Sequence, residues 1–233
     1  MSGLFILIFI IVTFFIYSII STIVIRKMDI KIIRRVPQER TIALTFDDGP
    51  HPLHTSALLE ILKRHGVKAT FFVVGENAEQ NPGLIKRMVD EGHSLGLHHY
   101  RHISSWFLTP WGLKKQLERT NEVLKRITGE GTYLYRPPWG HLNFSSLMFA
   151  NRYRIIIWSH IFKDWKVKEC KEHLSRRLNH SDSEGAVFVL HDNGATLGAD
   201  EDAPKYMVEC VDAFIKDALE RDIRFISLDE AFQ

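Results

Sequence analysis

Cysteine is scarce in this sequence. Two cysteines, Cys170 and Cys210, occur in 233 residues, which excludes the disulfide-dense scaffolds typical of small secreted domains. They lie on predicted helices that flank a predicted strand, so a disulfide between them is geometrically possible. Two buried free thiols are the preferred interpretation, and the count does not decide the cellular compartment.

Segments that would separate domains or mark repeats are also missing. The sequence has no long Gly/Ser or Pro linker, no low-complexity tract and no repeat of 20–50 residues. The net charge is only +2, and the basic residues do not gather on one periodic face, which argues against a nucleic-acid partner. The roughly two hundred residues that follow the first segment are enough for one domain of the α/β-barrel size class.

One long hydrophobic run is present, at the N-terminus. Residues Leu4–Ile25 are apolar except for a few Thr, Ser and Tyr, and a run longer than about 18 residues can cross a bilayer as a helix. It is too long for a typical signal-peptide core, and no convincing cleavage site follows it. A buried core helix is disfavoured because the run shows no polar face. Residues 1–27 are therefore predicted to be a retained single-span membrane anchor.

Basic residues follow this run, and none precedes it. They are Arg26, Lys27, Lys31, Arg34 and Arg35. Residues 28–40 are predicted to be a basic juxtamembrane linker, and residues 41–233 a single folded domain. The positive-inside tendency would place that domain in the cytoplasm. These residues could instead contact the membrane surface or an anionic wall polymer.

The folded part alternates between strand and helix patterns. Strands are predicted at Thr41–Phe46, Ala69–Val74, Ser94–Leu97, Tyr133–Arg136, Ile155–Trp158, Ala186–His191 and Ile223–Leu228. Helices are predicted at Thr55–His65, Pro82–Glu91, Leu113–Thr128, Asn143–Asn151, Val167–Leu178 and Ala203–Arg221. Such alternation is typical of parallel strands joined by helical crossovers. About seven parallel strands predict an α/β fold of the irregular (β/α) barrel type, although periodicity alone does not exclude an open doubly wound sheet.

Two adjacent aspartates stand at the end of the first strand pattern. Asp47 and Asp48 follow the apolar stretch Ile42–Leu44, and Gly49 and Pro50 then form a tight turn. Neighbouring carboxylates repel each other, a cost that a shared cation offsets. The pair therefore suggests divided roles, with one carboxylate for a metal and one for a proton. An Asp-rich surface turn is the alternative for this motif taken alone.

Three histidines gather within five residues after a later strand pattern. His98, His99 and His102 occur in this stretch, and His98 and His102 are four residues apart. This spacing lets two imidazoles converge on one ion. With one aspartate they make a His-His-Asp set, which leaves an open coordination position for water, as catalytic zinc sites do.

Five segments together carry a family resemblance. They are Thr45–Pro50, Glu91–His102, Arg136–Gly140, Trp158–Trp165 and Val187–Asp192. In this order and spacing they resemble the metal-dependent polysaccharide deacetylases, carbohydrate esterase family four. Each motif alone is weak, whereas five in order are specific. The resemblance covers nearly all of the predicted folded domain and implies an irregular (β/α) barrel.

The resemblance assigns a metal site and a base to this chain. Asp48, His98 and His102 would bind the metal. Asp47 would be the general base that takes a proton from the metal-bound water, and Arg136 would pair with Asp47 and orient it. A carboxylate beside a cation and an arginine stays ionised, which suits the role of a base.

The resemblance also assigns an acid and a substrate pocket. His191 would be the general acid that protonates the leaving amine, and Asp164 would hold and tune it. An imidazole beside a carboxylate is more easily kept as imidazolium, which suits this role. Trp165 and Val189 would line the pocket for the acetyl methyl group. The backbone N–H of Trp139 would help the metal to hold the oxyanion.

Several positions depart from the family pattern. His99 stands where Ser or Thr is usual, and we expect it to support the ligand loop rather than to face solvent. Leu97 replaces a frequent Asn, Trp139 replaces a Tyr, and an earlier Asp found in many relatives is missing near Ile161. None of these changes removes a ligand, the base or the acid. The site is therefore predicted to be competent, with an unspecified sugar preference.

Other conspicuous residues have plainer interpretations. His51 and His54 are predicted to be loop residues at the barrel mouth, although they could approach the substrate. His65 is predicted to lie at the C-terminus of a helix, where a cation interacts favourably with the helix dipole. Trp106 and Phe107 are predicted equally well as a sugar platform or as packing residues.

The sequence thus predicts a membrane-anchored hydrolase with one divalent metal ion. Two histidines and a carboxylate suit zinc, and cobalt or nickel would also be accepted. The preferred substrate is an N-acetylated amino-sugar polymer of the envelope, such as peptidoglycan, with the domain outside the cell. The alternatives are an O-acetyl esterase, a cytoplasmic-face enzyme for lipid- or nucleotide-linked sugars, and a non-catalytic protein that binds metal and glycan.

Overall fold

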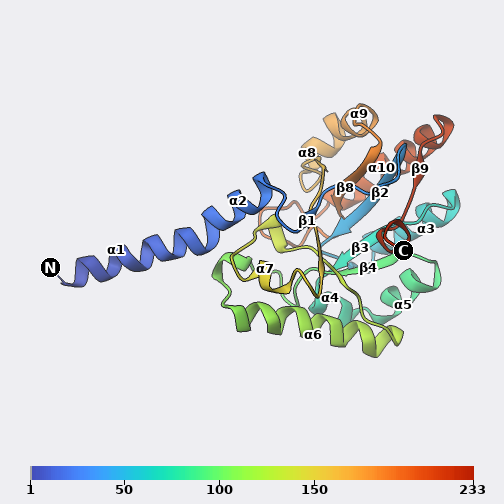
Figure 1. The fold of residues 1–233 in the computed structure, drawn as a ribbon. Helices are drawn as coiled ribbons and strands as arrows, with labels where there is room; N and C mark the ends of the chain where they lie inside the picture. Colours follow the sequence, from blue (N-terminus) through green and yellow to red (C-terminus); the bar gives the residue numbers. More distant parts are fainter. Residues whose placement is uncertain (1) are drawn as a thin grey trace.

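A computed structural model describes residues 2–233 as one nine-stranded sheet flanked by helices, with a further helix that projects from the domain (Figure 1). The strand order is β1-β6-β5-β4-β3-β2-β8-β7, with β9 beside β2, and the ladders between these strands are parallel. The strands are β1 (Ile32–Ile33), β2 (Thr41–Asp47), β3 (Thr70–Val73), β4 (Ser94–Leu97), β5 (Leu134–Tyr135), β6 (Arg154–Ile156), β7 (His160–Ile161), β8 (Glu184–His191) and β9 (Arg224–Phe225).

The helices pack around the outside of this sheet (Figure 1). Those of the domain are α3 (His54–His65), α4 (Gly75–Gln80), α5 (Pro82–Asp90), η2 (Ser105–Phe107), α6 (Pro110–Thr128), η3 (Pro138–Gly140), α7 (Ser146–Phe149), α8 (Val167–Glu169), η4 (Cys170–Leu174), α9 (Ser175–Asn179), α10 (Ala203–Glu220) and α11 (Leu228–Ala231). The predicted alternation of strands and helices is confirmed, in the form of an open half-barrel.

Two short strands are not predicted by the sequence patterns. Both β1 and β7 contain two residues and, unlike the equally short β5 and β9, do not lie within a longer strand pattern that could be recognised. They are the terminal strands of the order above, at the two sides of the opening in the half-barrel. The parallel arrangement brings the carboxyl ends of the remaining strands to one edge, where barrel active sites are built.

Strand β2 lies at the centre and is buried over its whole length. Its side chains alternate between two environments, as the pleat requires. Leu44 and Phe46 belong to the large core cluster, whereas Ala43 belongs to a smaller cluster on the other face. By the same alternation, Thr45 and Asp47 share the face of Ala43. Asp47, the last residue of β2, therefore belongs to the interior face of the half-barrel.

Local signals explain where the helices begin and end. The hydroxyl of Thr109 accepts a hydrogen bond from the N–H of Gly112 at 3.1 Å, which caps the start of α6, and Pro110 occupies its first turn. Helices α3 and α6 end at Gly66 and Gly129, whose φ angles of 66° and 86° suit glycine. These caps fix the lengths of the two crossovers.

The predicted linker over residues 28–40 is instead built into the domain. Strand β1 pairs with β6, and Ile32 and Val36 are buried in the core. Arg35 forms an antiparallel bridge with Ala186 of β8. The reason is that apolar residues are interspersed among the basic ones, which gives this segment a face to bury.

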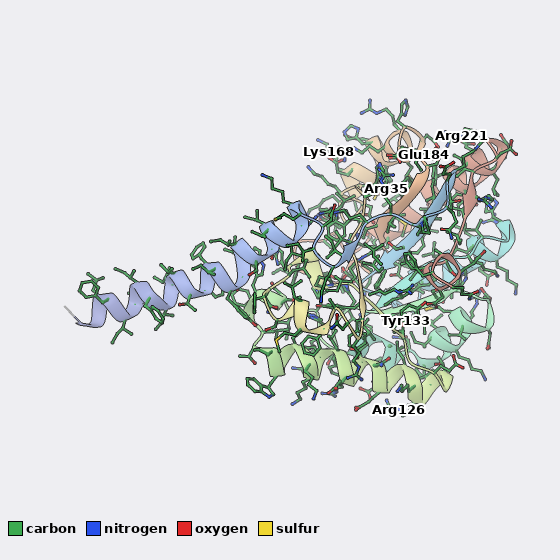
Figure 2. All side chains as sticks on the ribbon, in the orientation of Figure 1. Arg35, Arg126, Tyr133, Lys168, Glu184 and Arg221 are labelled. Atoms are coloured by element: carbon green, nitrogen blue, oxygen red, sulfur yellow. The ribbon has the colours of Figure 1, made fainter. Side chains whose placement is uncertain are left out.

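The projecting helix comprises α1 (Ser2–Phe15), the π-helical segment η1 (Ile16–Ile20) and α2 (Ser21–Lys27). The 25 residues Gly3–Lys27 are long and apolar enough to cross a membrane, although a signal sequence would pass the same test. Figure 2 shows the side chains of α1 projecting on all sides, away from the domain.

The two cysteines are free thiols, as predicted. Cys170 is buried, and its thiol donates to the carbonyl of Asp164 at 3.0 Å. Burial raises the pKa of the Cys170 thiol. Cys210 is only partly buried, and its thiol donates to the carbonyl oxygen of Cys170 at 3.4 Å. Both thiols therefore serve helix packing.

Candidate active site

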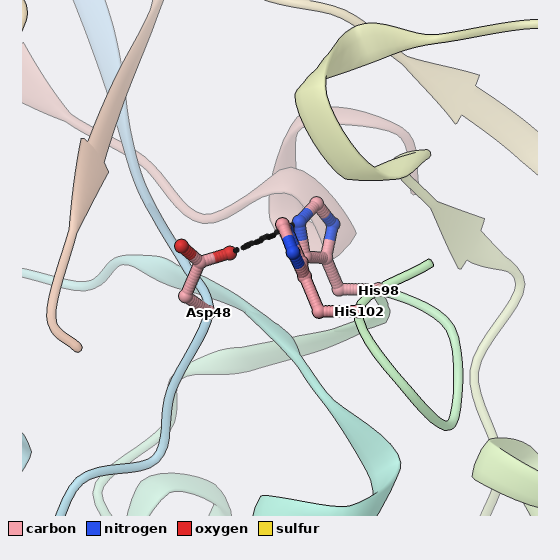
Figure 3. A group of neighbouring side chains, drawn as sticks. All are labelled: Asp48, His98 and His102. Atoms are coloured by element: carbon pink, nitrogen blue, oxygen red, sulfur yellow. Dashed lines mark ion pairs between the residues drawn. The ribbon is translucent and has the colours of Figure 1, made fainter. Parts of the chain in front are cut away.

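Three predicted metal ligands converge at the carboxyl edge of the sheet (Figure 3). Asp48 follows β2, and His98 and His102 follow β4. The Oδ1 atom of Asp48 lies 3.3 Å from Nε2 of His98 and 3.1 Å from Nε2 of His102. The ligand atoms of the three residues all lie within 4.8 Å of one another, a separation that one ion can bridge.

The chemistry of the three donors fits a metal ion. The Nδ1 of His98 lies 2.8 Å from the carbonyl oxygen of Arg136. Because a carbonyl only accepts, Nδ1 carries the proton and the lone pair of Nε2 faces Asp48, the tautomer that a metal requires. The Oδ1 of Asp48 is buried and has no hydrogen bond among the described residues. A buried, unpaired carboxylate oxygen opposite the imidazole lone pair of His98 is costly unless a cation joins them.

Asp48 is held in place by its neighbours. Its φ angle is 76°, a region in which Asp is tolerated better than most residues. The amides of Asn77 and Asn193 donate to its backbone carbonyl at 2.8 and 3.3 Å, and the hydroxyl of Thr196 donates to its Oδ2 at 2.7 Å. Thr196 thus occupies one carboxylate oxygen and leaves the other directed toward the histidines.

His99 supports the ligand loop, as expected. Its side chain is fully buried. Its Nδ1 lies 2.8 Å from the carbonyl of Ile103, and its Nε2 lies 2.9 Å from the hydroxyl of Tyr135. Nδ1 is therefore the donor and Nε2 the acceptor for the Tyr135 hydroxyl. Burial lowers the pKa of His99 to about 3, so the ring remains neutral.

Asp47 and Arg136 form a buried pair inside the half-barrel. One guanidinium nitrogen, Nη1, donates to Oδ1 of Asp47 at 2.7 Å and to the hydroxyl of Thr45 at 2.7 Å. Nε donates to the carbonyl of Ile156 at 3.2 Å, and the guanidinium lies 4.1 Å from the ring centroid of Phe72. Contacts with the three strands β2, β3 and β6 therefore fix the Arg136 guanidinium, which in turn orients the Asp47 carboxylate.

A second pair joins His191 to Asp164. His191 is the last residue of β8, and Asp164 follows β7 and is fully buried. The backbone N–H of His191 donates to Oδ2 of Asp164 at 2.6 Å, and its Nδ1 donates to Oδ1 at 3.1 Å. The ring is therefore held from one side, and its Nε2 remains available to the cleft.

The pKa values of His191 and Asp48 are shifted in opposite directions, which suits them to different roles. Burial alone would lower the pKa of His191, but Asp164, with Asp48 and Asp47, raises it to about 10. Burial would raise the pKa of Asp48, but its interaction with His102 and the charge of His191 hold it well below its ordinary value. At neutral pH the site therefore holds a protonated imidazole near an ionised carboxylate, and a cation beside Asp48 would lower the pKa of both groups.

Gly49 is required by the packing beneath the metal ligands. A Cβ atom at this position would lie 2.4 Å from Oδ2 of Asp192. Asp192 is buried and accepts a hydrogen bond from the hydroxyl of Thr55. Burial, together with Asp48 and Asp47, raises the pKa of Asp192 to about 7. Asp192 therefore braces the turn after β2.

A cavity of about 250 Å³ opens above these groups. Eight of the predicted residues line it: Asp47, Asp48, His98, His102, Trp139, Trp165, Val189 and His191. Arg136 and Asp164 are fully buried behind it. The ring of Trp139 is partly exposed and packs edge-on against His102 at a centroid distance of 4.1 Å. Trp165 packs edge-on against His191 at 5.4 Å. The structure thus brings all ten predicted site residues together.

Some residues of the cavity were not predicted. They are Trp158, Ile161 and the loop Thr196–Ala199. The segment containing Trp158 and Ile161 belongs to a recognised motif, so its position in that motif was the available signal. Thr196 follows the last motif by four residues and gives no pattern of its own. Leu197, beside it, is 87% exposed at the mouth.

The other conspicuous histidines and aromatics lie outside the cavity. The Nδ1 of His51 accepts from the N–H of His54 at 3.3 Å, at the start of α3. His65 ends α3 and lies 2.7 Å from Asp212. Trp106 stacks on His141 at 3.8 Å, which favours packing over a sugar platform.

Comparisons with known proteins agree with the geometry. Residues 34–155 match the family model described as polysaccharide deacetylase. The chain is 35% identical over 195 residues to a peptidoglycan-N-acetylglucosamine deacetylase of Bacillus cereus, which covers 82% of this chain and 68% of that protein. It is 34% identical over 202 residues to the peptidoglycan-N-acetylmuramic acid deacetylase PdaA of Bacillus subtilis, with 83% and 72% covered.

A solved structure shares the fold. The Bc1960 peptidoglycan N-acetylglucosamine deacetylase superposes with a TM-score of 0.76 at 30% identity, covering 88% of this chain and 94% of that one. The predicted resemblance is thereby confirmed. This chain belongs to the polysaccharide deacetylase family, and its similarity to peptidoglycan deacetylases supports a hydrolase that removes acetyl groups from amino sugars.

Proposed function

We propose that this protein is a membrane-anchored, metal-dependent deacetylase of an N-acetylated envelope polysaccharide, with a peptidoglycan-like glycan as substrate. The observation that carries the proposal is the meeting, in one cavity, of the Asp48–His98–His102 cluster with two oriented acid–base pairs. Relatives of similar sequence are named as peptidoglycan deacetylases, which supports the choice of glycan.

Asp48, His98 and His102 would hold the ion, which we propose to be zinc, with cobalt or nickel as alternatives. When bound, a divalent ion lowers the pKa of a water and polarises a carbonyl. Asp47, fixed by Arg136, accepts the proton of the attacking water. His191, held by Asp164, donates a proton from Nε2 to the leaving nitrogen.

The remaining predicted residues shape the substrate site. Trp165 and Val189 line the cavity near His191 and would receive the acetyl methyl group. Trp139 has a φ angle of 55°, and we assign its backbone N–H to the developing oxyanion, where one preorganised donor contributes about 3 kcal/mol. Its indole replaces the usual Tyr and would alter the subsite rather than the chemistry.

We further propose that residues 1–27 are the membrane anchor and that the domain faces the outside of the cell. The basic residues after the helix favour the opposite orientation. Two of them, however, form ion pairs with acidic residues at the surface of this chain. Arg34 lies 2.5 Å from Asp29, and Arg35 lies 2.6 Å from Asp182. Protease treatment of intact cells decides between the two sides, and protection there would favour a cytoplasmic-face substrate.

Acetate release by the purified full-length protein in detergent tests the proposed reaction. Peptidoglycan and N-acetylglucosamine oligomers should release acetate, chelation should stop the release, and zinc should restore it. Release from acetylated xylan alone would favour an O-acetyl esterase. A metal-loaded protein that binds glycan without releasing acetate would contradict the enzymatic role.

A further inference from the structure

The projecting helix is joined to the domain by polar contacts along its second half. The hydroxyl of Tyr17 donates to the carbonyl of Leu108 at 2.9 Å. The hydroxyl of Ser18 donates to the carbonyl of Trp106 at 2.9 Å, and the indole N–H of Trp106 donates to the hydroxyl of Thr22 at 2.8 Å. These polar groups are satisfied by the domain, so the helix is held in a defined orientation.

The π-helical segment η1 strengthens this junction. The N–H of Ser21 is bonded to the carbonyl of Ile16, and the carbonyl of Tyr17 accepts from the N–H of Phe144 at 2.9 Å. A π-bulge thus directs one helix carbonyl toward the domain. Ser18 and Ile25 are almost completely buried. From Tyr17 onward the helix is part of the folded unit, without a flexible linker.

The free part of the helix is too short to cross a bilayer by itself. Helix α1 contains 14 residues, which corresponds to about 21 Å at 1.5 Å per residue. The hydrocarbon core is about 30 Å thick and needs roughly 20 residues. The bilayer must therefore also surround part of the helix from Tyr17 onward, which we call the docked half. Its outer face is suitably apolar, since Ile16, Ile20 and Ile23 are 54%, 47% and 57% exposed.

Four large apolar side chains are exposed in two segments of the domain, residues 107–111 and 144–148, from which Leu108 and Phe144 contact the docked half. Phe107, Trp111, Phe144 and Met148 are 71%, 80%, 62% and 62% exposed, and we call them the apolar collar. Phe107 stacks on Phe14 of the helix at a centroid distance of 5.8 Å. Phe107 lies in η2, Trp111 in the first turn of α6 and Met148 in α7, and Phe144 shortly precedes α7. Figure 1 shows α7 and one end of α6 on the side of the domain from which α1 projects.

Phe144 shows that the collar is continuous with the helix surface. It lines an apolar groove together with Thr13, Ile16, Tyr17 and Ser21 of the helix. A surface that is continuous with a membrane span, and that carries Phe and Trp, has the composition of the bilayer interface. Exposed apolar surface of this kind marks an interaction site rather than ordinary solvent-facing surface.

We propose that the apolar collar is a second membrane-contact surface, inserted into the interfacial layer of the same phospholipid bilayer that α1 enters. The inference rests on the proposed membrane anchor and goes beyond it, because an anchor alone would leave the domain free to tilt. The docked helix also reaches the wall of the active-site cavity, since the Arg26 guanidinium lies 5.0 Å from the ring of Trp158. The cavity would therefore have a fixed height above the membrane.

Site-specific labelling of the full-length protein tests this proposal. The partly exposed Cys210 is replaced with Ser, and single cysteines are introduced as Phe107→Cys, Trp111→Cys and Met148→Cys. Leu219→Cys is the matched control, because Leu219 is an exposed apolar residue of α10. It lies two residues before Arg221, at the end of the domain away from α1 (Figure 2). Each cysteine receives an environment-sensitive fluorophore.

The labelled proteins are reconstituted into phosphatidylcholine–phosphatidylglycerol vesicles that contain lipids brominated near the headgroup end of the acyl chain. Collar labels should be quenched several-fold more by these lipids than the Leu219 label, and less by aqueous iodide. Circular dichroism melting of every variant confirms that each one is folded.

Two results would overturn the proposal, and they differ in meaning. Collar labels that iodide quenches as strongly as the Leu219 label, in protein that resists alkaline carbonate extraction, would reject the collar and leave the anchor intact. Extraction of the parent protein by carbonate would reject the anchor and the collar together. Neither result bears on deacetylation, which acetate release by the detergent-purified protein measures separately.

Discussion

The cavity and the N-terminal helix differ in which side chains they bury: charged groups are buried at the cavity, and apolar groups are exposed on the helix. In the cavity and directly behind it, charged side chains such as Asp47, Asp48 and Arg136 are buried. On the helix, the apolar side chains of residues 4–12 are between 46% and 70% exposed. Most polar atoms of these groups find partners within the chain, and among the exceptions is the Asp48 oxygen that faces the histidines. The apolar side chains of residues 4–12 belong to neither hydrophobic core cluster of the described residues. The fold itself therefore positions the charged groups of the cavity, whereas the exposed apolar side chains of the helix require an apolar environment outside the protein.

Removal of the acid or the base should have the largest effect on the cavity. Asp47→Asn and His191→Ala should each reduce kcat on the order of 10²–10⁴-fold, because proton transfer loses its donor or acceptor. Neither residue is a proposed metal ligand, so metal content should be unchanged. Acetate release under saturating substrate measures the effect, and wild-type kcat in either variant would exclude the assigned role.

The buried ion pair should matter far more for stability than an exposed one. Arg136→Met leaves Asp47 buried without its cation and should lower the free energy of unfolding by about 3–5 kcal/mol. Arg126→Met is the control, because its partner Glu79 is on the surface and both side chains are partly exposed (Figure 2). That change should cost less than about 1 kcal/mol.

Urea denaturation of both variants, with a chelator present, separates the two expectations. The chelator removes any contribution of a bound ion to the difference. Equal losses of stability in the two variants would mean that the interior of the half-barrel is more hydrated than its burial indicates.

The pH dependence of kcat/KM tests the role of Asp164 as the partner of the proposed acid His191. Asp164 is the main group that raises the pKa of His191 to about 10. Asp164→Asn removes that charge, so the imidazole loses its proton at lower pH. The alkaline limb of kcat/KM should therefore move to lower pH by roughly 1–3 pH units. A bound cation lowers the limb in both proteins, so the difference between them persists. An unchanged limb would exclude His191 as the titrating acid.

Truncation of the helix should have the smallest effect where it removes only the free part. Deletion of residues 2–15 should leave Tm and acetate release unchanged in detergent. Deletion of residues 2–31 also removes the buried Ile25 and the partners of Trp106. It should lower Tm by at least about 5 °C, given the apolar area lost. Equal Tm values for the two deletions would mean that the docked half of the helix contributes nothing to the fold.

The sequence was most informative where chemistry restricts residue identity. Asp47, His98 and His191 stand at strand ends within ordered motifs, and the structure brings them into one cavity. Thr196 could not be predicted, because a loop hydroxyl that donates to Asp48 follows no periodic pattern. Its position depends on how the loop after β8 folds back over β2.

The N-terminal segment shows the opposite limit. Its hydropathy predicted a membrane span and gave no indication that the second half of the helix packs against the domain. The signal for that packing was a polar stripe, since Ser18, Thr22 and Arg26 recur every four residues. Strand β1 was missed because two residues carry no period. In both cases tertiary contacts, rather than local propensity, decide the structure.

Metal content of the purified full-length protein tests the central claim most directly. The wild type and Asp47→Asn should each carry about one equivalent of a divalent metal by elemental analysis, because Asp47 is not a proposed ligand. His98→Ala and His102→Ala should each lose nearly all of it, since either change leaves two of three donors. Near-stoichiometric metal retained in both histidine variants would contradict the account.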